Sequence, residues 1–285
     1  MKDTLRVITI GGVLLVPFIA LIVIDGLFFP FITGKNFIFR IVVEIVFAAW
    51  ILLALYDRIY RPRFSYILAS SLSLVVVLFV ANTLGAHPET SWWSNFERME
   101  GYITILHLFL YFLVASSVLK TQKQWSWFWH LSLIAATFVA LGALSEYLAP
   151  GSTRVSGVLG NATYLAIYML FHTFLAMYLF VRNSRLELRI LYILLGLLFI
   201  FIMLQTGTRG TAIGMAAGLL TMVGYIALFA RSNPGFRKLA FASCAVLVLL
   251  AGSFWVVRDS AFVQSSSTLS RIANIDLQED LQVRF

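Results

Sequence analysis

Apolar segments of about twenty residues recur along most of this chain. An α-helix rises about 1.5 Å per residue, so such a segment is long enough to cross about 30 Å of hydrocarbon. Composition agrees with this reading, since 60% of the residues are hydrophobic and only 12% are charged, against about 25% charged in a soluble domain. The sequence therefore predicts an all-α, polytopic membrane helix bundle. We expect nine spans, one of which could be re-entrant, at about 7–29, 37–56, 65–84, 102–119, 125–148, 161–181, 187–205, 210–230 and 237–257.

The distribution of Lys and Arg between these spans predicts the orientation of the chain. The basic-rich set of span ends is assigned to the cytoplasm, which places the N-terminus inside and the end of the chain outside. The basic residues assigned to the cytoplasm are Lys2, Arg6, Arg58, Arg61, Arg63, Lys120, Lys123, Arg182, Arg185, Arg189, Arg231, Arg237 and Lys238. Arg98, Arg154, Arg209 and Arg284 fall on the outer side, where the rule does not call for arginine, so they need another explanation.

Composition also limits the partners and cofactors. The formal net charge of +8 follows from the excess of basic residues on the cytoplasmic side, so it does not indicate a nucleic-acid partner. The single cysteine, Cys244, lies in an apolar run and excludes a disulfide framework. No nucleotide-binding glycine pattern and no zinc-ligand spacing occurs. We expect no metal and no cofactor.

Two short polar, Gly-containing loops carry the outer arginines of the sixth and eighth spans. The first is Ala149–Ala166 (APGSTRVSGVLGNATYLA), with Arg154, and the second is Thr206–Gly210 (TGTRG), with Arg209. Guanidinium groups bind phosphate oxygens with a two-pronged geometry. Glycines let backbone N–H groups approach an anion, and a helix that starts after the loop adds its positive end. The pattern predicts an anion site, and a membrane-embedded diphosphate is the favoured ligand.

Supporting residues in these loops follow from the local geometry. Asn161 is expected to be the N-cap of the sixth span, with Gly157 and Gly160 giving a tight turn into it. The eighth span begins with Gly210, Gly214 and Gly218 at four-residue spacing, which favours close helix packing and would hold Arg209 in place. The alternative for Arg154 is interfacial snorkelling or pairing with Glu146, eight residues earlier.

Other polar residues have two interpretations each. The outer loop Gly85–Gly101 predicts an interfacial helix with locally paired charges, or an outer cavity lined by Arg98 and an acidic neighbour. Arg40 and Glu44 share a helix face and predict a neutralising pair, while a proton relay with Asp25, late in the first span, is the alternative. His107, His130 and His172 lie in or beside spans and are expected to be packed or hydrogen-bonded there.

These residues resemble the signatures of the O-antigen ligase and polysaccharide polymerase family. Arg154 followed by Gly160-Asn161, Tyr164, Leu165 and Ala166 is similar to one motif, although many members have proline where this chain has Ala162. Thr206-Gly-Thr-Arg209-Gly is similar to a second, SWWSNFERMEG (91–101) to an outer-loop form, and Gln282-Val-Arg284 to the onset of a third. The resemblance covers the chain from about residue 85.

The resemblance implies a metal-independent glycosyl transfer on the outer face of the bacterial inner membrane. The donor would be a glycan on undecaprenyl diphosphate, and the acceptor a hydroxyl on a lipid or glycan. Arg209, Arg284 and Arg154 would bind the diphosphate, with support from Gly157, Gly160, Asn161, Tyr164, Gly210 and Arg98. A histidine in a large outer loop would act as the base, and it would lie beyond Phe285.

Two further expectations concern the domains and the alternative function. We expect a helical bundle over 1–257 and the start of a large periplasmic loop over 258–285, cut within that loop, so that this chain alone would not turn over substrate. A transporter or flippase for an anionic lipid or small anion would also explain the arginines, although the cytoplasmic side carries no matching motif. A scaffold whose arginines only pair with outer acidic residues is the third interpretation.

Overall fold

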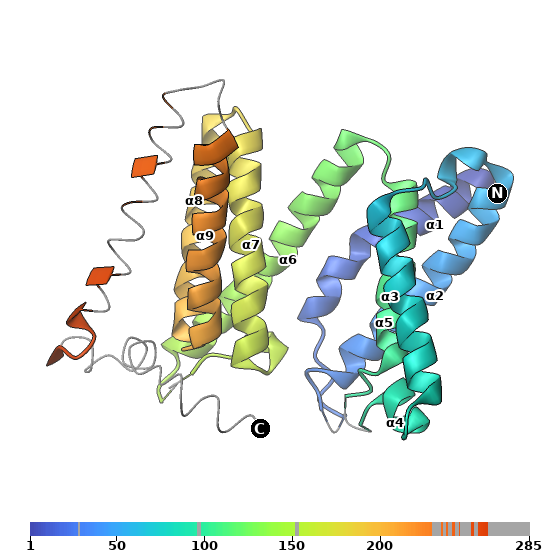
Figure 1. Cartoon of the computed structure of the whole chain (residues 1–285), viewed down its shortest axis with the longest axis horizontal. Helices are drawn as coiled ribbons and strands as arrows, with labels where there is room; N and C mark the ends of the chain where they lie inside the picture. Colours follow the sequence, from blue (N-terminus) through green and yellow to red (C-terminus); the bar gives the residue numbers. More distant parts are fainter. Residues whose placement is uncertain are drawn as a thin grey trace. The chain divides into compact units, whose positions relative to one another are not determined.

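The computed structural model describes residues 1–27, 29–95, 98–151 and 154–229, and beyond them residues 235, 238, 241–242, 245, 252–253 and 256–261. Every regular element in these residues is helical (Figure 1). Seven helices are long and apolar enough to cross a membrane, and a shorter apolar helix covers Tyr102–Val118. The prediction of a polytopic membrane helix bundle is confirmed.

The described residues form two compact units. Unit 1 comprises Met1–Val139 and Val158–Gly160, and unit 2 comprises Ala140–Gly157 and the described residues from Asn161 onward. The helices of unit 1 are α1 (Lys2–Leu15), η1 (Val16–Leu21), α2 (Thr33–Tyr56), η2 (Arg58–Tyr60), α3 (Tyr66–Leu84), α4 (Pro88–Trp93), α5 (Tyr102–Val118) and α6 (Gln122–Leu148) as far as Val139. Unit 2 contains the rest of α6, then α7 (Ala162–Arg182), α8 (Leu186–Gln205) and α9 (Arg209–Phe229). The short helix η3 (Gly157–Leu159) is divided, with its first residue in unit 2 and the other two in unit 1.

Unit 1 is built on the packing of α1, α2 and α5. Val13, Val46 and Val114 form the centre of its buried apolar cluster, which Trp50 and Val118 extend. The approach of α1 to α2 is close, because a Cβ placed on Gly12 would lie 2.2 Å from Val46 Cγ2. The ammonium group of Lys2, the first residue of α1, lies 2.8 Å from the carboxylate of Asp57, which directly follows α2, and holds the pKa of that carboxyl below its usual range.

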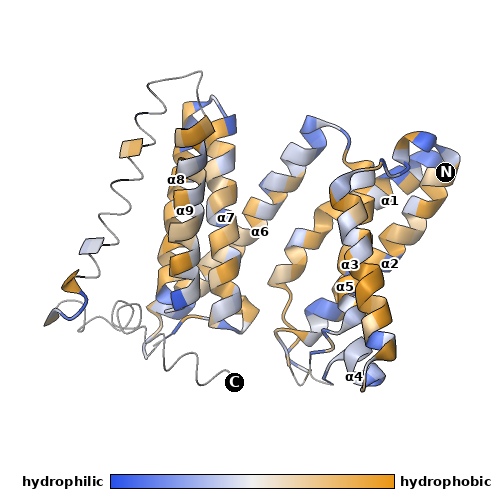
Figure 2. Cartoon of the chain, in the orientation of Figure 1, coloured by the Kyte–Doolittle hydropathy of each residue, from blue (hydrophilic) through white to orange (hydrophobic). Residues whose placement is uncertain are grey.

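Unit 2 is built on α7 and α8, which pack side by side along their lengths (Figure 1). Leu165, Met169 and Ala176 repeat at near-helical spacing on the buried face of α7, and Phe199 and Ile202 are fully buried on α8. Hydrophobic colour covers most of the length of the long helices, and hydrophilic residues gather toward their ends (Figure 2). This is the pattern that lipid around the helices and water at their ends require.

The first eight predicted spans each correspond to a helix, and the second to eighth lie within a few residues of their predicted bounds. The first span differs, because the helix starts at Lys2 and its regular turns end at Leu21 instead of residue 29. Asp25 is therefore not in this span but in an exposed turn after it. The span expected over 237–257 falls largely outside the described residues, as do residues 262–285 of the expected outer loop.

Candidate functional site

Arg154 lies in the connection between α6 and α7, in unit 2. Its side chain is exposed, whereas its neighbour Val155 is almost fully buried and anchors this part of the loop. The Nε of Arg154 donates a hydrogen bond of 2.9 Å to the carbonyl oxygen of Thr206. This contact joins the two arginine-containing segments that the sequence singled out, although they are about fifty residues apart.

The turn that receives this hydrogen bond is fixed by its own polar groups. Thr206 is fully buried, and its hydroxyl donates to the carbonyl oxygen of Met203 at 2.6 Å. The backbone N–H of Thr208 donates to the Thr206 hydroxyl oxygen at 3.2 Å, and Gly207 takes the left-handed conformation with φ of +61°. A buried threonine, its hydrogen bonds and a glycine in that conformation therefore fix the geometry of the turn.

Arg209 is the first residue of α9 and directly follows this turn. Its side chain is half-buried, and Gly210 beside it is exposed with open space where a Cβ would be. We refer to Arg154, Thr206 and Arg209 as the arginine site. The hydrogen bond from Arg154 to Thr206 therefore brings the Arg154 loop to the turn that directly precedes Arg209.

Glu146, near the end of α6, determines the conformation of the Arg154 loop, but not by pairing with Arg154. Its carboxylate accepts hydrogen bonds from the backbone N–H of Gly157 at 2.6 Å and of Ser156 at 3.2 Å. These loop amides were expected to be available to an anionic ligand, and that expectation is wrong because a carboxylate of the protein already occupies them. The one sequence feature that could have predicted this contact is the presence of a carboxylate, Glu146, ten residues before the Gly-containing part of the loop.

The start of α7 follows the sequence prediction closely. Asn161 is its N-cap, and its side-chain oxygen accepts hydrogen bonds from the N–H groups of Thr163 at 2.8 Å and Tyr164 at 3.4 Å. Gly157 and Gly160 have φ of +56° and +66°, the left-handed region that glycine enters at little cost. The capping amides of Thr163 and Tyr164 are thus satisfied within the protein.

Residues 158–160 belong to unit 1 and are held there. The Nζ of Lys35 donates to the carbonyl oxygen of Val158 at 2.5 Å, and a Cβ on Gly160 would overlap the ring of Phe31. Arg98 is also in unit 1, where it is exposed and its carbonyl oxygen accepts from the Asn36 side chain at 2.9 Å. Arg284 lies outside the described residues.

Arg40 and Glu44 do not pair as the sequence predicted. The guanidinium of Arg40 donates to the carbonyl oxygen of Met99 and, at 2.7 Å, to the hydroxyl of Thr104. Glu44 lies 3.2 Å from Nε2 of His107 instead. Acceptors on α5 and in the loop before it take the place of the i, i+4 pair, although both bonds come from one terminal nitrogen and the buried Nε of Arg40 has no hydrogen-bond partner among the described residues.

The histidines in the spans are hydrogen-bonded within their own helices, as predicted. Nδ1 of His107, His130 and His172 lies 2.6 to 2.8 Å from the carbonyl oxygen four residues earlier. His87 is the N-cap of α4. Within the part of the chain that the structure describes, no group of three or more His, Cys, Asp or Glu side chains could hold a metal ion.

No protein-family model, curated protein or solved structure matches this chain. The function is therefore argued from the arginine site and from the motifs around it. Chemically, the arginine site contains two planar guanidinium groups that stay charged at any biological pH, one in the loop before α7 and one on the first residue of α9.

Proposed function

We propose that this protein is a membrane glycosyl transferase of the O-antigen ligase and polymerase type. It would transfer a glycan from undecaprenyl diphosphate to an acceptor hydroxyl on the outer face of the bacterial inner membrane. The observation that carries the proposal is the hydrogen bond from Arg154 Nε to the Thr206 carbonyl oxygen, because it connects the two arginine motifs at one end of unit 2.

The roles of the two arginines follow from the chemistry of the leaving group. In the transfer, the acceptor oxygen forms a bond to the anomeric carbon while the bond from that carbon to the diphosphate oxygen breaks. Negative charge develops on the departing diphosphate, and fixed guanidinium groups stabilise it. The acceptor proton passes to a base, for which the resemblance implies a histidine beyond Phe285. Arg284 would join the diphosphate site.

Binding of the diphosphate lipid tests the proposal on the chain as it stands. Purified protein in detergent is titrated with undecaprenyl diphosphate and, separately, with undecaprenol, which has the same tail and no charge. We expect preference for the diphosphate, and about tenfold weaker binding in Arg154→Lys and in Arg209→Lys, because lysine keeps the charge and loses the fork. In cells that assemble the glycan, Arg209→Lys in a protein that also carries the expected outer loop should abolish transfer at normal expression.

Arg61→Lys is the matched control. Its Nε also donates to a backbone carbonyl, that of Ala54 at 3.1 Å, but it lies between α2 and α3 in unit 1. Equal binding of the two lipids by the wild type, or unchanged binding in both arginine-site variants, would overturn the proposal. Movement of the diphosphate lipid between leaflets of proteoliposomes would support the flippase alternative instead.

A further inference from the structure

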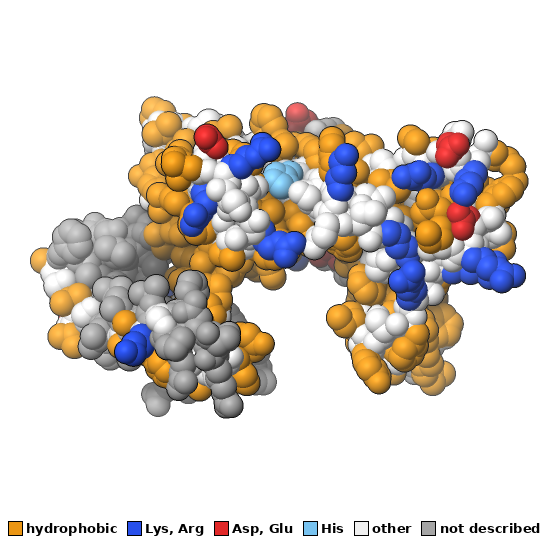
Figure 3. Space-filling model, turned by 90° about the horizontal axis from the view of Figure 1, so that it is seen from above, with side chains coloured by type: hydrophobic (Ala, Val, Ile, Leu, Met, Phe, Trp, Pro, Cys, Tyr) orange, Lys and Arg blue, Asp and Glu red, His pale blue; other side chains and the backbone are white. Residues whose placement is uncertain are grey.

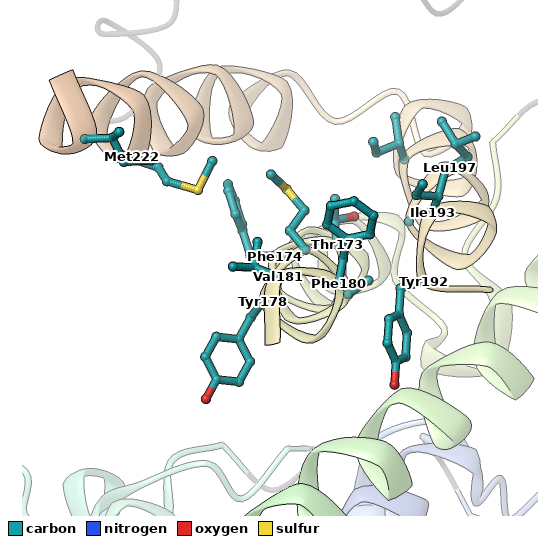
Figure 4. Close-up of a pocket in the computed structure, with 14 residues that line it drawn as sticks. Thr173, Phe174, Tyr178, Phe180, Val181, Tyr192, Ile193, Leu197 and Met222 are labelled. Carbon is teal, nitrogen blue, oxygen red and sulfur yellow. The ribbon is translucent and has the colours of Figure 1, made fainter. Parts of the chain in front are cut away.

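An apolar groove lies in unit 2, along α7, α8 and α9. It has a volume of 620 Å³, within the range of about 300–1,000 Å³ that is usual for ligand sites. Phe174 and Val181 line it from α7, Ile193 and Leu197 from α8, and Met222 from α9 (Figure 4). The groove is distinct from the arginine site, whose three residues are not among those that line it.

Three arginines stand at one end of this groove. Arg182 directly follows the lining residue Val181 at the end of α7, and Arg185 and Arg189 lie at the start of α8. All three side chains are exposed. Figure 3 shows that Lys and Arg side chains lie beside hydrophobic surface at such helix ends.

Two of these arginines are held against rings that line the groove. The guanidinium of Arg189 lies 4.4 Å from the ring centroid of Phe180, and that of Arg182 lies 6.0 Å from the ring centroid of Tyr178. A cation over an aromatic face is attracted by the ring quadrupole, so these contacts hold the two charges beside the lining of the groove. Glu187 is the one acidic residue between Arg182 and Arg189, so the formal charge of this segment remains positive.

We propose that this groove binds an anionic glycerophospholipid, with an acyl chain in the groove and the headgroup phosphate on Arg182, Arg185 and Arg189. The length of the groove is close to that of an acyl chain in one leaflet. The lining of α7 extends from Thr173 to Val181, about 12 Å along a helix, while half of the hydrocarbon core is about 15 Å thick. These arginines belong to the ends that the Lys/Arg distribution assigns to the cytoplasm, where leaflet lipids are anionic and basic pockets between helices bind their headgroups.

Lipid retention by the purified full chain tests the proposal. The protein is taken from mixed micelles with equal amounts of phosphatidylglycerol and phosphatidylcholine, and retained lipids are identified by native mass spectrometry. The wild type should retain phosphatidylglycerol in preference, because the choline cation is repelled by the arginines. Joint replacement by Arg182→Gln, Arg185→Gln and Arg189→Gln should reduce that preference at least about fivefold.

Two matched controls separate this site from general effects of charge and shape. The first control removes the same charge from the connection between α2 and α3 in unit 1, by joint Arg58→Gln, Arg61→Gln and Arg63→Gln. It should leave the preference for phosphatidylglycerol unchanged. Leu197 and Leu194 are each 58% exposed on α8, but only Leu197 lines the groove. Leu197→Trp should therefore reduce retention of both lipids several-fold, and Leu194→Trp should not.

Three outcomes would overturn the proposal. One is equal retention of the two lipids by the wild type. Another is loss of preference in the unit 1 control as large as in the groove variant. The third is that the wild type retains neither lipid and that Leu197→Trp retains no less. That result would assign the groove to packing within the protein, for example against the span expected over 237–257.

Discussion

Glu146 is the residue on which the conformation of the Arg154 loop depends. Its carboxylate accepts hydrogen bonds from the backbone N–H of Ser156 and of Gly157, and the Ser156 hydroxyl lies 3.4 Å from it. A hydrogen bond to a charged group contributes about 1.5–3 kcal/mol, and an amide left without a partner costs a similar amount. The arginine site therefore depends on a carboxylate that binds no arginine.

We predict that Glu146→Ala releases this loop. The Ser156 and Gly157 amides lose their acceptor, so the chain around Arg154 should open more often. Trypsin should then cleave after Arg154 several times faster, with the fragment identified by mass spectrometry. The protein should also unfold at a lower temperature in the same detergent.

Glu187→Ala is the comparison for this experiment. Glu187 is an exposed carboxylate in the first turn of α8, so its removal changes the net charge equally without touching the loop. If the two variants are cleaved after Arg154 at the same rate, the loop is held by something other than Glu146.

Local chemistry was predictable at this scale, and contacts between distant residues were not. The role of Asn161 follows from its position directly before an apolar helix, because an N-cap bonds to amides two and three residues later. The role of Glu146 depends on partners ten and eleven residues away, and that of Arg40 on a partner about sixty residues away. The i, i+4 spacing predicted an ion pair between Arg40 and Glu44. That spacing rule describes an isolated helix, so it does not include the acceptors that α5 and the loop before it place beside Arg40.

At the scale of elements, α1 and α2 are positioned by a glycine contact. A Cβ on Gly12 would lie 2.2 Å from Val46 Cγ2, whereas one on the adjacent Gly11 meets nothing within 4 Å. Val46 is buried and its β-branched side chain has few rotamers to escape into. A larger side chain should therefore be tolerated at Gly11 but not at Gly12.

We predict that Gly12→Ala destabilises the protein by about 1–3 kcal/mol, the usual cost of overpacking, while Gly11→Ala is neutral or stabilising by up to about 1 kcal/mol from helix propensity. The measurement is the unfolding midpoint of each variant in one detergent. Adding Val46→Ala to Gly12→Ala should recover part of the loss, since it removes the overlapping methyl groups. Equal midpoints for the two single variants would mean that α1 does not pack on α2 through Gly12.

The end of α1 shows why one element boundary was wrong while the others were close. Hydropathy continues through Phe29, so a prediction based on apolar length extends the span that far. Pro17 lacks a backbone N–H and its ring clashes with the carbonyl of the preceding turn, so the α-helix ends at Leu15 and continues only as the 3-10 helix Val16–Leu21. The second to eighth predicted spans contain no interior proline, and for them apolar length was sufficient.

At the scale of the whole molecule, sidedness connects the two proposals. The arginine site lies at the start of α9 and before the start of α7, whereas Arg182, Arg185 and Arg189 lie around the opposite end of α7. Lys and Arg are retained preferentially on the cytoplasmic side of spans. The sequence therefore predicts that the arginine site faces outward, to a lipid-linked donor, and that the groove opens to the cytoplasmic leaflet.

Cysteine labelling tests this arrangement directly. With Cys244→Ser removing the single native cysteine, Ala149→Cys marks the Arg154 loop, Gly210→Cys marks Arg209, and Ser184→Cys marks the opposite end of α7; all three positions are exposed. In intact bacterial spheroplasts, an impermeant maleimide should label the first two variants, and should label Ser184→Cys only after the membrane is permeabilised. Labelling of Ala149→Cys and Gly210→Cys from opposite sides would separate the two arginines and remove the basis of the diphosphate site. If Ser184→Cys alone is labelled in intact spheroplasts, the topology is the inverse of the predicted one. The arginine site would then face the cytoplasm, which excludes an outer-face transferase. The lipid groove would still be possible, but in the opposite leaflet.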